Sequence, residues 1–443
     1  MNPLIPRLTT MIAVACLTAL PVAARPVESA DGQPPAPFHL YARSAVLIDQ
    51  ATGRVLFEHD ADEPLPPASV AKLMSLHLVY EKLEDRSISR GDVVSITTNA
   101  FADHQEPGSS LMNLGPGQIV TVEELMKGMA VASGNDAATA LAEYVAGSTP
   151  KFVRLMNDEA SFLGYKITRF ADPSGVGPGN RTTARELADF CRRYIDLHPQ
   201  ALEELHSLRE FDYPLVQNMA DGRMAAIRTR KQFNPNYLVW DDFGVDGLKT
   251  GHLNNDNFTA AITAKRGDMR LIVVLLGVPG RSLDDGGRHR SSDGMRLLSY
   301  GFRNFATVRL DPPTLPPVRV WKGFDREVAL VPPEEITITA RRSEMEKLAY
   351  TIEIPEPVVA PVEPHQRVGS LVYMAEDTEV GRVPLSAASG VQSAGLLRRA
   401  WDSVLLGLTS VVGGPTAVLR ATIGSIPSSP ILSAGGAEAV VKR

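Results

Sequence analysis

The chain has 443 residues, 22% of them charged, and a formal net charge of −6. This length allows two or more domains with cores of their own. The lack of a basic excess makes a nucleic-acid partner unexpected, and no apolar run reaches the roughly 18 to 20 residues of a membrane-spanning helix.

The N-terminus has the pattern of a secretory signal peptide. Arg7 precedes the apolar run 11–20, and the small residues Val22-Ala23-Ala24 follow it. A charged start, a short apolar run and small residues at the end are typical of a cleaved leader. We therefore predict that residues 1–24 direct export, and that the Pro-rich, polar segment 25–40 is a linker.

The chain contains two cysteines. Cys16 follows Ala13-Val14-Ala15, a weak likeness to a lipoprotein cleavage box, but Ala13 stands where such a box usually has leucine. Ordinary cleavage is the favoured reading, and it leaves Cys191 as the only cysteine of the mature protein, so no intrachain disulfide is expected. Cys191 lies in the helical pattern 187–194, which predicts a small core residue.

A β-hairpin and a long helix are the first predicted elements. Residues 44–49 and 54–57 read as two strands around a turn at Gly53. Pro66 and Pro67 can precede a helix, and apolar residues then recur at helical spacing over 68–83.

Three further helices have recognisable ends. Thr121 and Glu124 form a capping box before an apolar periodic run that ends ahead of Ser133. The next helix spans 136–146 and stops at Gly147. Another capping box, Thr183 with Glu186, begins the helix that carries Cys191.

The remaining elements of this domain predict an antiparallel sheet. Gly175-Val176-Gly177-Pro178-Gly179 lies outside a strand–helix junction, so an ordinary loop is favoured over a nucleotide-binding loop. Three strands are predicted over 245–252, 258–264 and 271–277, the last two joined by a turn at 265–268, and a helix over 294–305 follows. A hairpin, a block of helices and then antiparallel strands indicate an α+β domain with one sheet covered by helices, which we place at 41–310.

The C-terminal third differs in composition. Short alternating runs at 336–339, 348–354 and 371–374 predict a small β-rich domain over 311–388, either a spacer or an interaction platform. Residues 413–443 are expected to form a flexible tail.

Residues 395–412 predict an amphipathic helix. Three charged residues would each cost roughly 2.5 to 3.5 kcal/mol within a bilayer, so a helix lying in the membrane interface is favoured, and packing on the protein's own surface is the alternative. The apolar face comprises Leu396, Leu397, Trp401, Val404, Leu405, Leu408, Val411 and Val412.

Three short motifs carry the chemistry. Ser69 and Lys72 are neighbours on one helix face, and a serine hydroxyl needs a nearby base to become a nucleophile. Lysine can be that base only where burial or another cation lowers its pKa. Ser133-Gly134-Asn135 lies between two helices, and Lys249-Thr250-Gly251 lies on a predicted strand. These motifs in this order resemble those of β-lactamases and penicillin-binding proteins.

The chain resembles the D-alanyl-D-alanine carboxypeptidases, the low-molecular-mass penicillin-binding proteins. Similar stretches are 108–112, 246–252 and 365–369, and the resemblance runs from about Tyr41 to about Val412. It implies a β-lactamase/transpeptidase-like fold followed by a β-rich domain, and a C-terminal helix that anchors the protein to the periplasmic face of the cytoplasmic membrane.

The resemblance also implies roles for individual residues. Ser69 would be the acylated nucleophile, Lys72 its general base and Ser133 the proton relay to the leaving group. Asn135 would position the substrate amide and Lys72.

The second half of the site lies on the strand 245–252. Lys249 would supply a cation that favours a neutral Lys72 and attracts the substrate carboxylate, to which Thr250 can donate. Gly251 would let a peptide approach the strand edge, and the backbone N–H groups of Ser69 and His252 would form the oxyanion hole. Two positions depart from the family pattern, Leu253 after His252 and Pro235 between two asparagines.

We therefore expect a serine DD-carboxypeptidase that removes the terminal D-alanine from peptidoglycan stem pentapeptides, with β-lactams acylating Ser69. No His-Glu-x-x-His pattern or cysteine ligand set is present, so no metal ion or other cofactor is expected. The alternatives are a DD-endopeptidase, a class A-like β-lactamase and a catalytically weak wall-binding protein.

Overall fold

The computed structural model describes residues 38–411 and 417–422, apart from 220–228, 242 and 356. The predicted signal peptide lies outside these residues, as does most of the predicted linker. Leu40, at the end of that linker, is buried in the core of the first domain.

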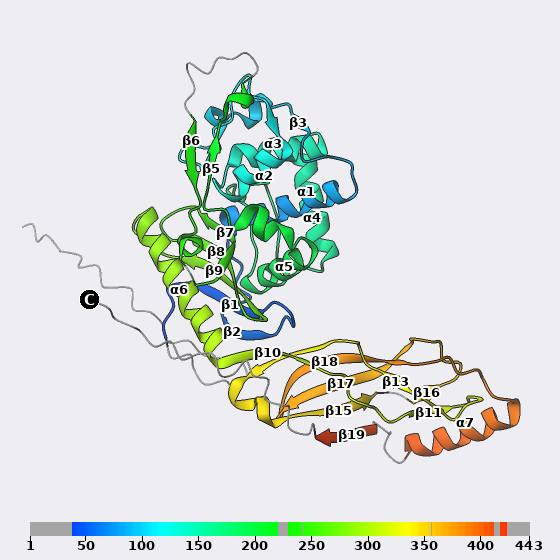
Figure 1. The fold of residues 1–443 in the computed structure, drawn as a ribbon. Coiled ribbons are helices and arrows are strands. Elements are labelled where there is room, and N and C mark those ends of the chain that lie inside the picture. The colour runs from blue at the N-terminus through cyan, green and yellow to red at the C-terminus, as the bar shows by residue number, and fades with distance from the viewer. Residues whose placement is uncertain (1–37, 220–228, 242, 356, 412–416, 423–443) are drawn as a thin grey trace, which may run out of the picture.

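The first domain is built on a five-stranded antiparallel sheet of order β2-β1-β9-β8-β7 (Figure 1). The predicted hairpin and the three later strands are confirmed, and β7 lies at the end of the strand order. The strands are β1 (Ser44–Asp49), β2 (Val55–His59), β7 (Val245–His252), β8 (Phe258–Arg266) and β9 (Met269–Val278).

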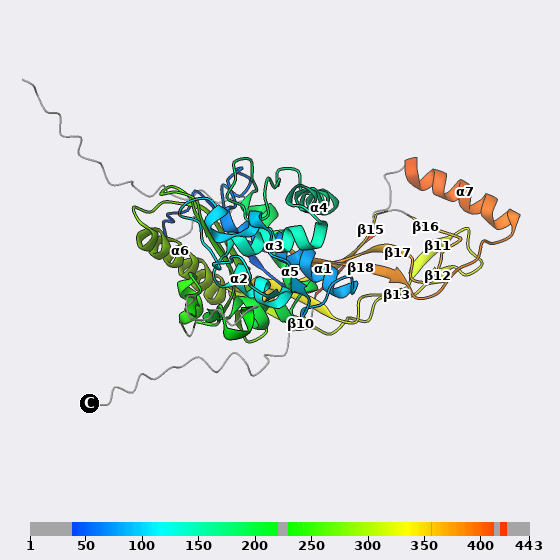
Figure 2. The same ribbon diagram turned by 90° about the horizontal axis from the view of Figure 1, so that it is seen from above.

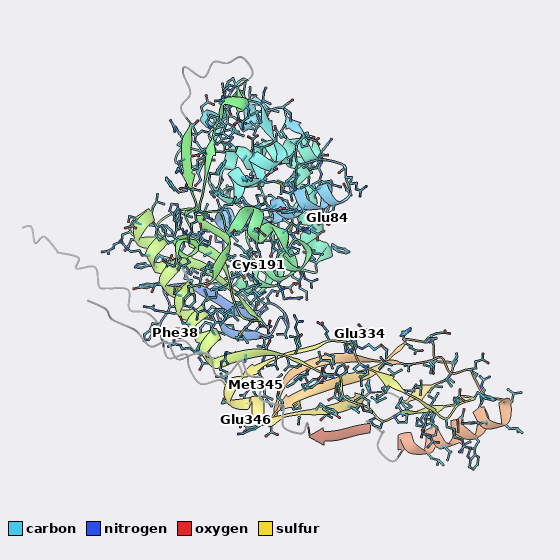
Figure 3. All side chains as sticks on the ribbon, in the orientation of Figure 1. Phe38, Glu84, Cys191, Glu334, Met345 and Glu346 are labelled. Atoms are coloured by element: carbon cyan, nitrogen blue, oxygen red, sulfur yellow. The ribbon has the colours of Figure 1, made fainter. Side chains whose placement is uncertain are left out.

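Helices cover both faces of this sheet. The side chains between α6 (Leu283–Asn304) and the sheet form one apolar core. The opposite face packs on α5 (Ala184–Leu197) and the remaining helices, which form a second core. Cys191 on α5 is fully buried in this second core (Figure 3), as predicted. The predicted α+β architecture is thus confirmed.

The helix α6 begins eleven residues earlier than predicted. The Ser282 side chain accepts a hydrogen bond from Asp285 N at 3.1 Å and caps the helix. The sequence gives little sign of this first part because Gly286 and Gly287 disfavour a helix. The structure needs them there, since a Cβ at Gly286 would lie 2.3 Å from the Phe258 ring.

Four helices lie between the hairpin and α5 in the sequence, and their buried residues share one core with those of α5. The predicted capping box of Thr121 and Glu124 is present at the start of α2, and Gly147 ends α3 with a φ of +75°. At α5, Thr183 accepts from Glu186 N, but the Glu186 carboxylate accepts from backbone N–H groups of the preceding loop, so the predicted box is only half formed. The helices are α1 (Lys72–Glu84), α2 (Val122–Ala130), α3 (Asn135–Ala146) and α4 (Thr149–Phe162).

Short elements complete this domain. They are η1 (Ala68–Ala71), β3 (Val93–Val94), η2 (Thr98–Ala100), η3 (Ala102–His104), β4 (Val120–Thr121), η4 (Leu202–His206), β5 (Glu210–Tyr213), η5 (Val216–Asn218), β6 (Arg230–Phe233) and η6 (Tyr237–Trp240).

The second domain is β-rich, as predicted. Its largest sheet has the order β13-β18-β17-β15-β19, and β10 pairs with β14. Within the predicted tail, 413–443, the structure describes only residues 417–422, which form β19 and pair with β15. The elements are β10 (Phe305–Leu310), β11 (Val318–Trp321), β12 (Glu327–Val328), β13 (Leu330–Val331), β14 (Ile336–Arg341), η7 (Arg342–Lys347), β15 (Leu348–Ile354), β16 (Val358–Val359), β17 (Arg367–Ala375), β18 (Thr378–Ala387) and β19 (Ala417–Thr422).

Hydrogen bonds join the two domains at the β1–β2 turn. The Thr307 hydroxyl donates to the Asp49 carboxylate at 2.7 Å, and the Thr52 hydroxyl donates to Thr339 Oγ1 at 3.1 Å. The continuous run from α6 into β10 makes the covalent connection (Figure 1).

The helix α7 (Leu396–Val411) lies at the end of the second domain far from the first (Figure 2). Its Asp402 is buried and accepts a hydrogen bond from Lys322 N at 2.6 Å, and Arg398 donates to Phe324 O at 3.1 Å. Leu397 and Trp401 are 91% and 64% exposed, so the helix turns polar groups to the domain and apolar groups outward. Among the described residues, no helix has both the length and the apolar character needed to cross a membrane.

Candidate active site

Ser69 lies in the 3-10 turn η1, one turn ahead of Lys72 at the start of α1. The Lys72 ammonium nitrogen is 2.9 Å from Ser69 Oγ, 2.7 Å from Asn135 Oδ1 and 3.1 Å from Ser174 O. Lys72 is fully buried and Ser69 is 6% exposed. The predicted pair is therefore in direct contact, with the amide of Asn135 holding the amine in place.

Burial sets the protonation state of Lys72. It lowers the pKa of this amine to about 7, while the negative charges of Asp172 and Asp136 act in the opposite direction. Because that pKa lies near neutral pH, a large fraction of Lys72 is an uncharged amine that can accept a proton.

The segment Ser133–Asn135 lies at the start of α3. Ser133 is buried with a φ of +58°, a conformation that non-glycine residues seldom adopt. Its hydroxyl has no hydrogen-bond partner among the described side and main chains. Asn135 N donates to Ser110 O at 2.9 Å, which joins this segment to the 108–112 stretch.

Asp136 holds the 112–114 backbone against the start of α3. Its carboxylate accepts hydrogen bonds from the backbone N–H groups of Met112, Asn113 and Leu114 at 2.8 to 2.9 Å, and from Ala137 N. Sequence reasoning did not single out Asp136 as a site residue, although it directly follows the motif Ser133-Gly134-Asn135.

The strand β7 brings Lys249, Thr250 and Gly251 to the other side of Ser69. Lys249 is 2% exposed and donates to Thr250 O at 2.9 Å. Burial, with the positive charges of Lys72 and Arg290, holds the pKa of Lys249 well below its ordinary value. The positive charge of Lys72 thus disfavours the charged form of Lys249. The effect of Lys249 on Lys72 that the family resemblance implies stays a prediction.

Gly251 is required by the packing of β7 on η1. A Cβ at this position would lie 2.8 Å from Ser69 N, 2.8 Å from the Ala68 side chain and 2.4 Å from the Thr259 hydroxyl. From the sequence, we expected a glycine here so that a substrate peptide could approach the strand. The structure gives a second reason, because η1 occupies the space that a side chain at position 251 would need.

Arg290 on α6 supports the same strand. It is almost fully buried and donates to Gly251 O at 3.1 Å and to Pro235 O at 2.8 Å. The proline at position 235 therefore contributes its carbonyl oxygen. The two flanking asparagines bond within the protein, Asn234 through its own amide to Leu208 O and Asn236 to Gly247 O.

His252 ends β7 with its ring 4.4 Å from the ring of Phe258. Burial, with the charge of Arg290, lowers the pKa of this imidazole. Leu253, which departs from the family pattern, lies in the turn between β7 and β8, where its N–H donates to Asn257 O.

The glycine-rich stretch 175–179 is a loop, as predicted, and it adjoins the site. Asp172 accepts hydrogen bonds from the N–H groups of Ser174, Gly175 and Gly177 at 2.7 to 2.8 Å, which shapes the loop so that Ser174 O reaches Lys72. Gly175 has a φ of +83°, and a Cβ there would lie 2.0 Å from Ala68 O. Sequence reasoning missed this contribution because it arises from contact between distant segments.

The fold and the site define a class. A serine paired with a buried lysine, beside the edge strand of an antiparallel sheet that lies between helical layers, is the arrangement of β-lactamase/transpeptidase-like serine enzymes. The predicted fold class is confirmed by the solved structures similar to this chain.

Comparison with known proteins gives the family. Residues 29–280 match the family described as D-alanyl-D-alanine carboxypeptidase, and residues 314–393 match the penicillin-binding protein 5 C-terminal domain. The chain is 35% identical to D-alanyl-D-alanine carboxypeptidase DacC of Escherichia coli (strain K12), over 82% of this chain and 88% of that protein. It is 30% identical to DacF of Bacillus subtilis (strain 168), over 88% and 95%.

Penicillin-binding protein 5 of Haemophilus influenzae has a similar structure, with a TM-score of 0.71 and 29% identity over 81% of this chain and 99% of that chain. The chain belongs to the D-alanyl-D-alanine carboxypeptidase family of low-molecular-mass penicillin-binding proteins, as the sequence motifs predicted.

Proposed function

We propose that this protein is a serine DD-carboxypeptidase that removes the terminal D-alanine from peptidoglycan stem pentapeptides through an acyl-enzyme on Ser69. The observation that carries this proposal is the 2.9 Å contact between Ser69 Oγ and the buried amine of Lys72. Relatives that match over most of the chain bear the corresponding name, which supports the substrate class.

In the acylation step, neutral Lys72 takes the proton of the Ser69 hydroxyl while Oγ attacks the carbonyl carbon of the penultimate D-alanine. The tetrahedral intermediate collapses as its C–N bond breaks, and the leaving amine of the terminal D-alanine receives, through Ser133, the proton that Lys72 took from Ser69, so Lys72 is neutral again. In deacylation, water attacks the ester carbonyl and gives a proton to Lys72, and Lys72 returns that proton to Ser69 Oγ as the C–O bond breaks.

The other site residues position the substrate. Asn135 holds the amine of Lys72 and is placed to contact the substrate amide. Lys249 and Thr250 are placed to bind the terminal carboxylate, whose negative charge would favour the charged form of Lys249. The N–H groups of Ser69 and His252 are the proposed donors to the oxyanion.

The alternatives differ in substrate. The D-alanyl-D-alanine endopeptidase of Pseudomonas aeruginosa is 31% identical over only 42% of this chain, whereas carboxypeptidases match over most of it, so the carboxypeptidase reading is favoured. A class A-like β-lactamase is disfavoured by the second domain. A wall-binding protein would not need a base beside Ser69.

One experiment separates these functions. We would supply a pentapeptide ending in D-alanyl-D-alanine and, separately, a crosslinked dimer, and measure free D-alanine and monomer. We expect D-alanine from the pentapeptide with the parent chain and none with Ser69→Ala. Cleavage of the dimer alone would favour the endopeptidase, and no turnover by folded protein would favour wall binding.

We also propose that the protein is exported and held at the periplasmic face of the cytoplasmic membrane by α7. The supporting observation is the orientation of this helix: Asp402 faces the domain, while Leu396, Leu397 and Trp401 are exposed. An exposed apolar stripe next to polar groups suits a helix that lies in the membrane interface.

A further inference from the structure

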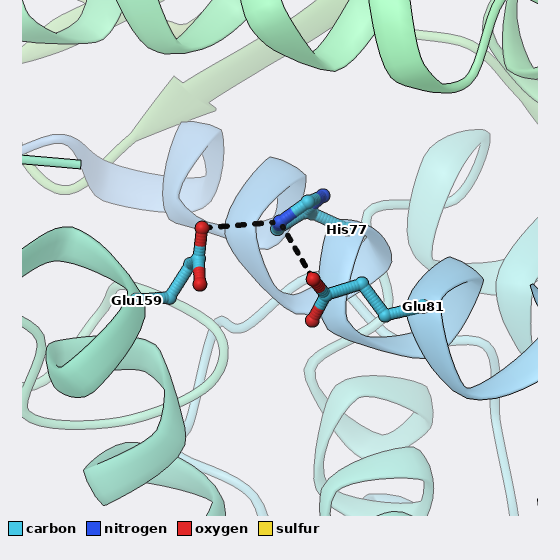
Figure 4. A group of neighbouring side chains, drawn as sticks. All are labelled: His77, Glu81 and Glu159. Atoms are coloured by element: carbon cyan, nitrogen blue, oxygen red, sulfur yellow. Dashed lines mark ion pairs between the residues drawn. The ribbon is translucent and has the colours of Figure 1, made fainter. Parts of the chain in front are cut away.

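A second cluster of chemically capable side chains lies in the helical layer, apart from the serine site. His77 and Glu81 are four residues apart on α1 and so share one helix face, and Glu159 reaches them from α4 (Figure 4). His77 Nε2 is 3.7 Å from Glu81 Oε1 and 3.5 Å from Glu159 Oε1. Three donor atoms from two helices thus point to one place.

These separations are too long for hydrogen bonds, which need roughly 2.7 to 3.2 Å. His77 is 3% exposed, and its buried Nε2 has no hydrogen-bond partner in the part of the chain that the structure describes. Two ligand atoms at about 2.0 to 2.1 Å from a tetrahedral zinc ion stand about 3.4 Å apart. The two distances from His77 Nε2 therefore match ligands around an ion better than they match direct bonds, and all three donor atoms lie within 4.8 Å of one another.

The neighbouring hydrogen bonds orient the His77 ring. His198 Nδ1 is 3.0 Å from Glu84 Oε1, and His198 Nε2 is 2.8 Å from His77 Nδ1. A carboxylate only accepts, so His198 Nδ1 donates to Glu84. Burial favours a neutral His198, whose Nε2 then accepts from His77 Nδ1.

This assignment leaves a lone pair on His77 Nε2 that faces two carboxylates. Three electron-rich groups in one place require a positive partner, either a proton on Nε2 or a cation between them. A metal-ligating histidine usually donates its other ring N–H to a carboxylate, a backbone carbonyl or water, which fixes the ring. Here His77 Nδ1 is held in the same way by His198, which in turn donates to Glu84.

We propose that His77, Glu81 and Glu159 form a binding site for a divalent transition-metal ion, with Zn²⁺ as the first candidate and water as the fourth ligand. One imidazole and two carboxylates suit zinc, and their two negative charges balance the ion. Glu81, with 44% of its side chain exposed, leaves the site open to solvent so that an ion can enter.

The ion would act on structure. It would tie α1, which begins with Lys72, to α4, and through His198 to the C-terminal end of α5. Sequence motifs give no sign of this site, because the third ligand comes from a different helix and no His-Glu-x-x-His spacing is present.

The test is titration of the untagged, chelator-treated chain with Zn²⁺ by calorimetry, and with Co²⁺ by visible absorption. We expect one ion per chain, a tetrahedral Co²⁺ spectrum, and a Tm that rises by several degrees with Zn²⁺. Glu159→Gln and Glu81→Gln should each weaken binding at least about tenfold, and His77→Gln should abolish the Co²⁺ spectrum.

Asp285→Asn is the matched control. Asp285 and His289 on α6 are also four residues apart, with Nε2 and Oδ1 at the same 3.7 Å, but among the described residues no second carboxylate lies within 4.0 Å of that ring. This variant should bind zinc as the parent does. Because the Glu81 side chain is partly exposed, the Glu81→Gln variant is expected to fold. Unchanged acylation by a β-lactam would show that the fold of each variant is intact.

Two results would overturn the proposal. One is no zinc binding to the folded parent chain, with nitrogen NMR showing a proton on His77 Nε2. The other is equal binding to the parent, Glu81→Gln and Glu159→Gln, which would place the ion elsewhere.

Discussion

Substitution of Gly251 by alanine should damage the site more than the fold. The new Cβ would lie 2.8 Å from Ser69 N, and it has to move by roughly 0.6 Å to reach the 3.4 Å at which ordinary contact begins. It would also lie 2.4 Å from the hydroxyl of Thr259, which donates to Pro67 O at 3.0 Å and so helps hold the serine turn.

The magnitude follows from these contacts. Overpacking of a well-packed region costs about 1 to 3 kcal/mol, and displacement of a reacting atom by about 1 Å can reduce a rate roughly 100-fold. We therefore expect Gly251→Ala to lower the free energy of unfolding by about 1 to 3 kcal/mol and to slow acylation by a β-lactam by about 10- to 100-fold.

Urea unfolding and stopped-flow acylation with a chromogenic cephalosporin would measure the two effects. Gly91→Ala is the control, because a Cβ there would meet nothing within 4 Å. Acylation of folded Gly251→Ala at the parent rate would show that contact with β7 does not position Ser69.

Three other predictions concern the protonation of Lys72, the hydrogen bonds of Asp136 and the contact of α7 with a membrane. Because the pKa of Lys72 is about 7 and its neutral form is the base, acylation should be slow below pH 7 and rise to a plateau above it; a rate that falls as pH rises through 7 would contradict this role. Asp136→Asn places an amide against backbone donors, so it should cost about 1 to 3 kcal/mol of stability in urea melts, whereas an unchanged midpoint would argue against the four hydrogen bonds. Leu397→Glu should reduce sedimentation with anionic liposomes while Ser403→Glu, off the apolar stripe, should not, and equal binding by both would exclude α7 as the membrane-binding face.

Local patterns in the sequence were enough to predict the site motifs. Ser69 and Lys72 are one turn apart, and β7 was predicted with the bounds that the structure gives it. Capping and apolar periodicity act over a few residues, so they can be recognised without the fold.

Contacts between distant segments could not be predicted in this way. Ser174 O reaches Lys72 only because the 172–180 loop folds against η1. Arg290 reaches Gly251 O from the first half of α6, which was not predicted to be helical. Glycines 286 and 287 disfavour a helix by intrinsic propensity, and packing against Phe258 outweighs that preference.

In the proposed mechanism, Ser69 is activated by Lys72 and forms a covalent acyl-enzyme. Its most direct test is the mass of the intact chain after brief exposure to benzylpenicillin, followed by peptide mapping of the adduct. We expect a single adduct on Ser69 in the parent chain and none in a folded Ser69→Ala variant. An adduct on another residue, or none in the folded parent chain, would contradict it.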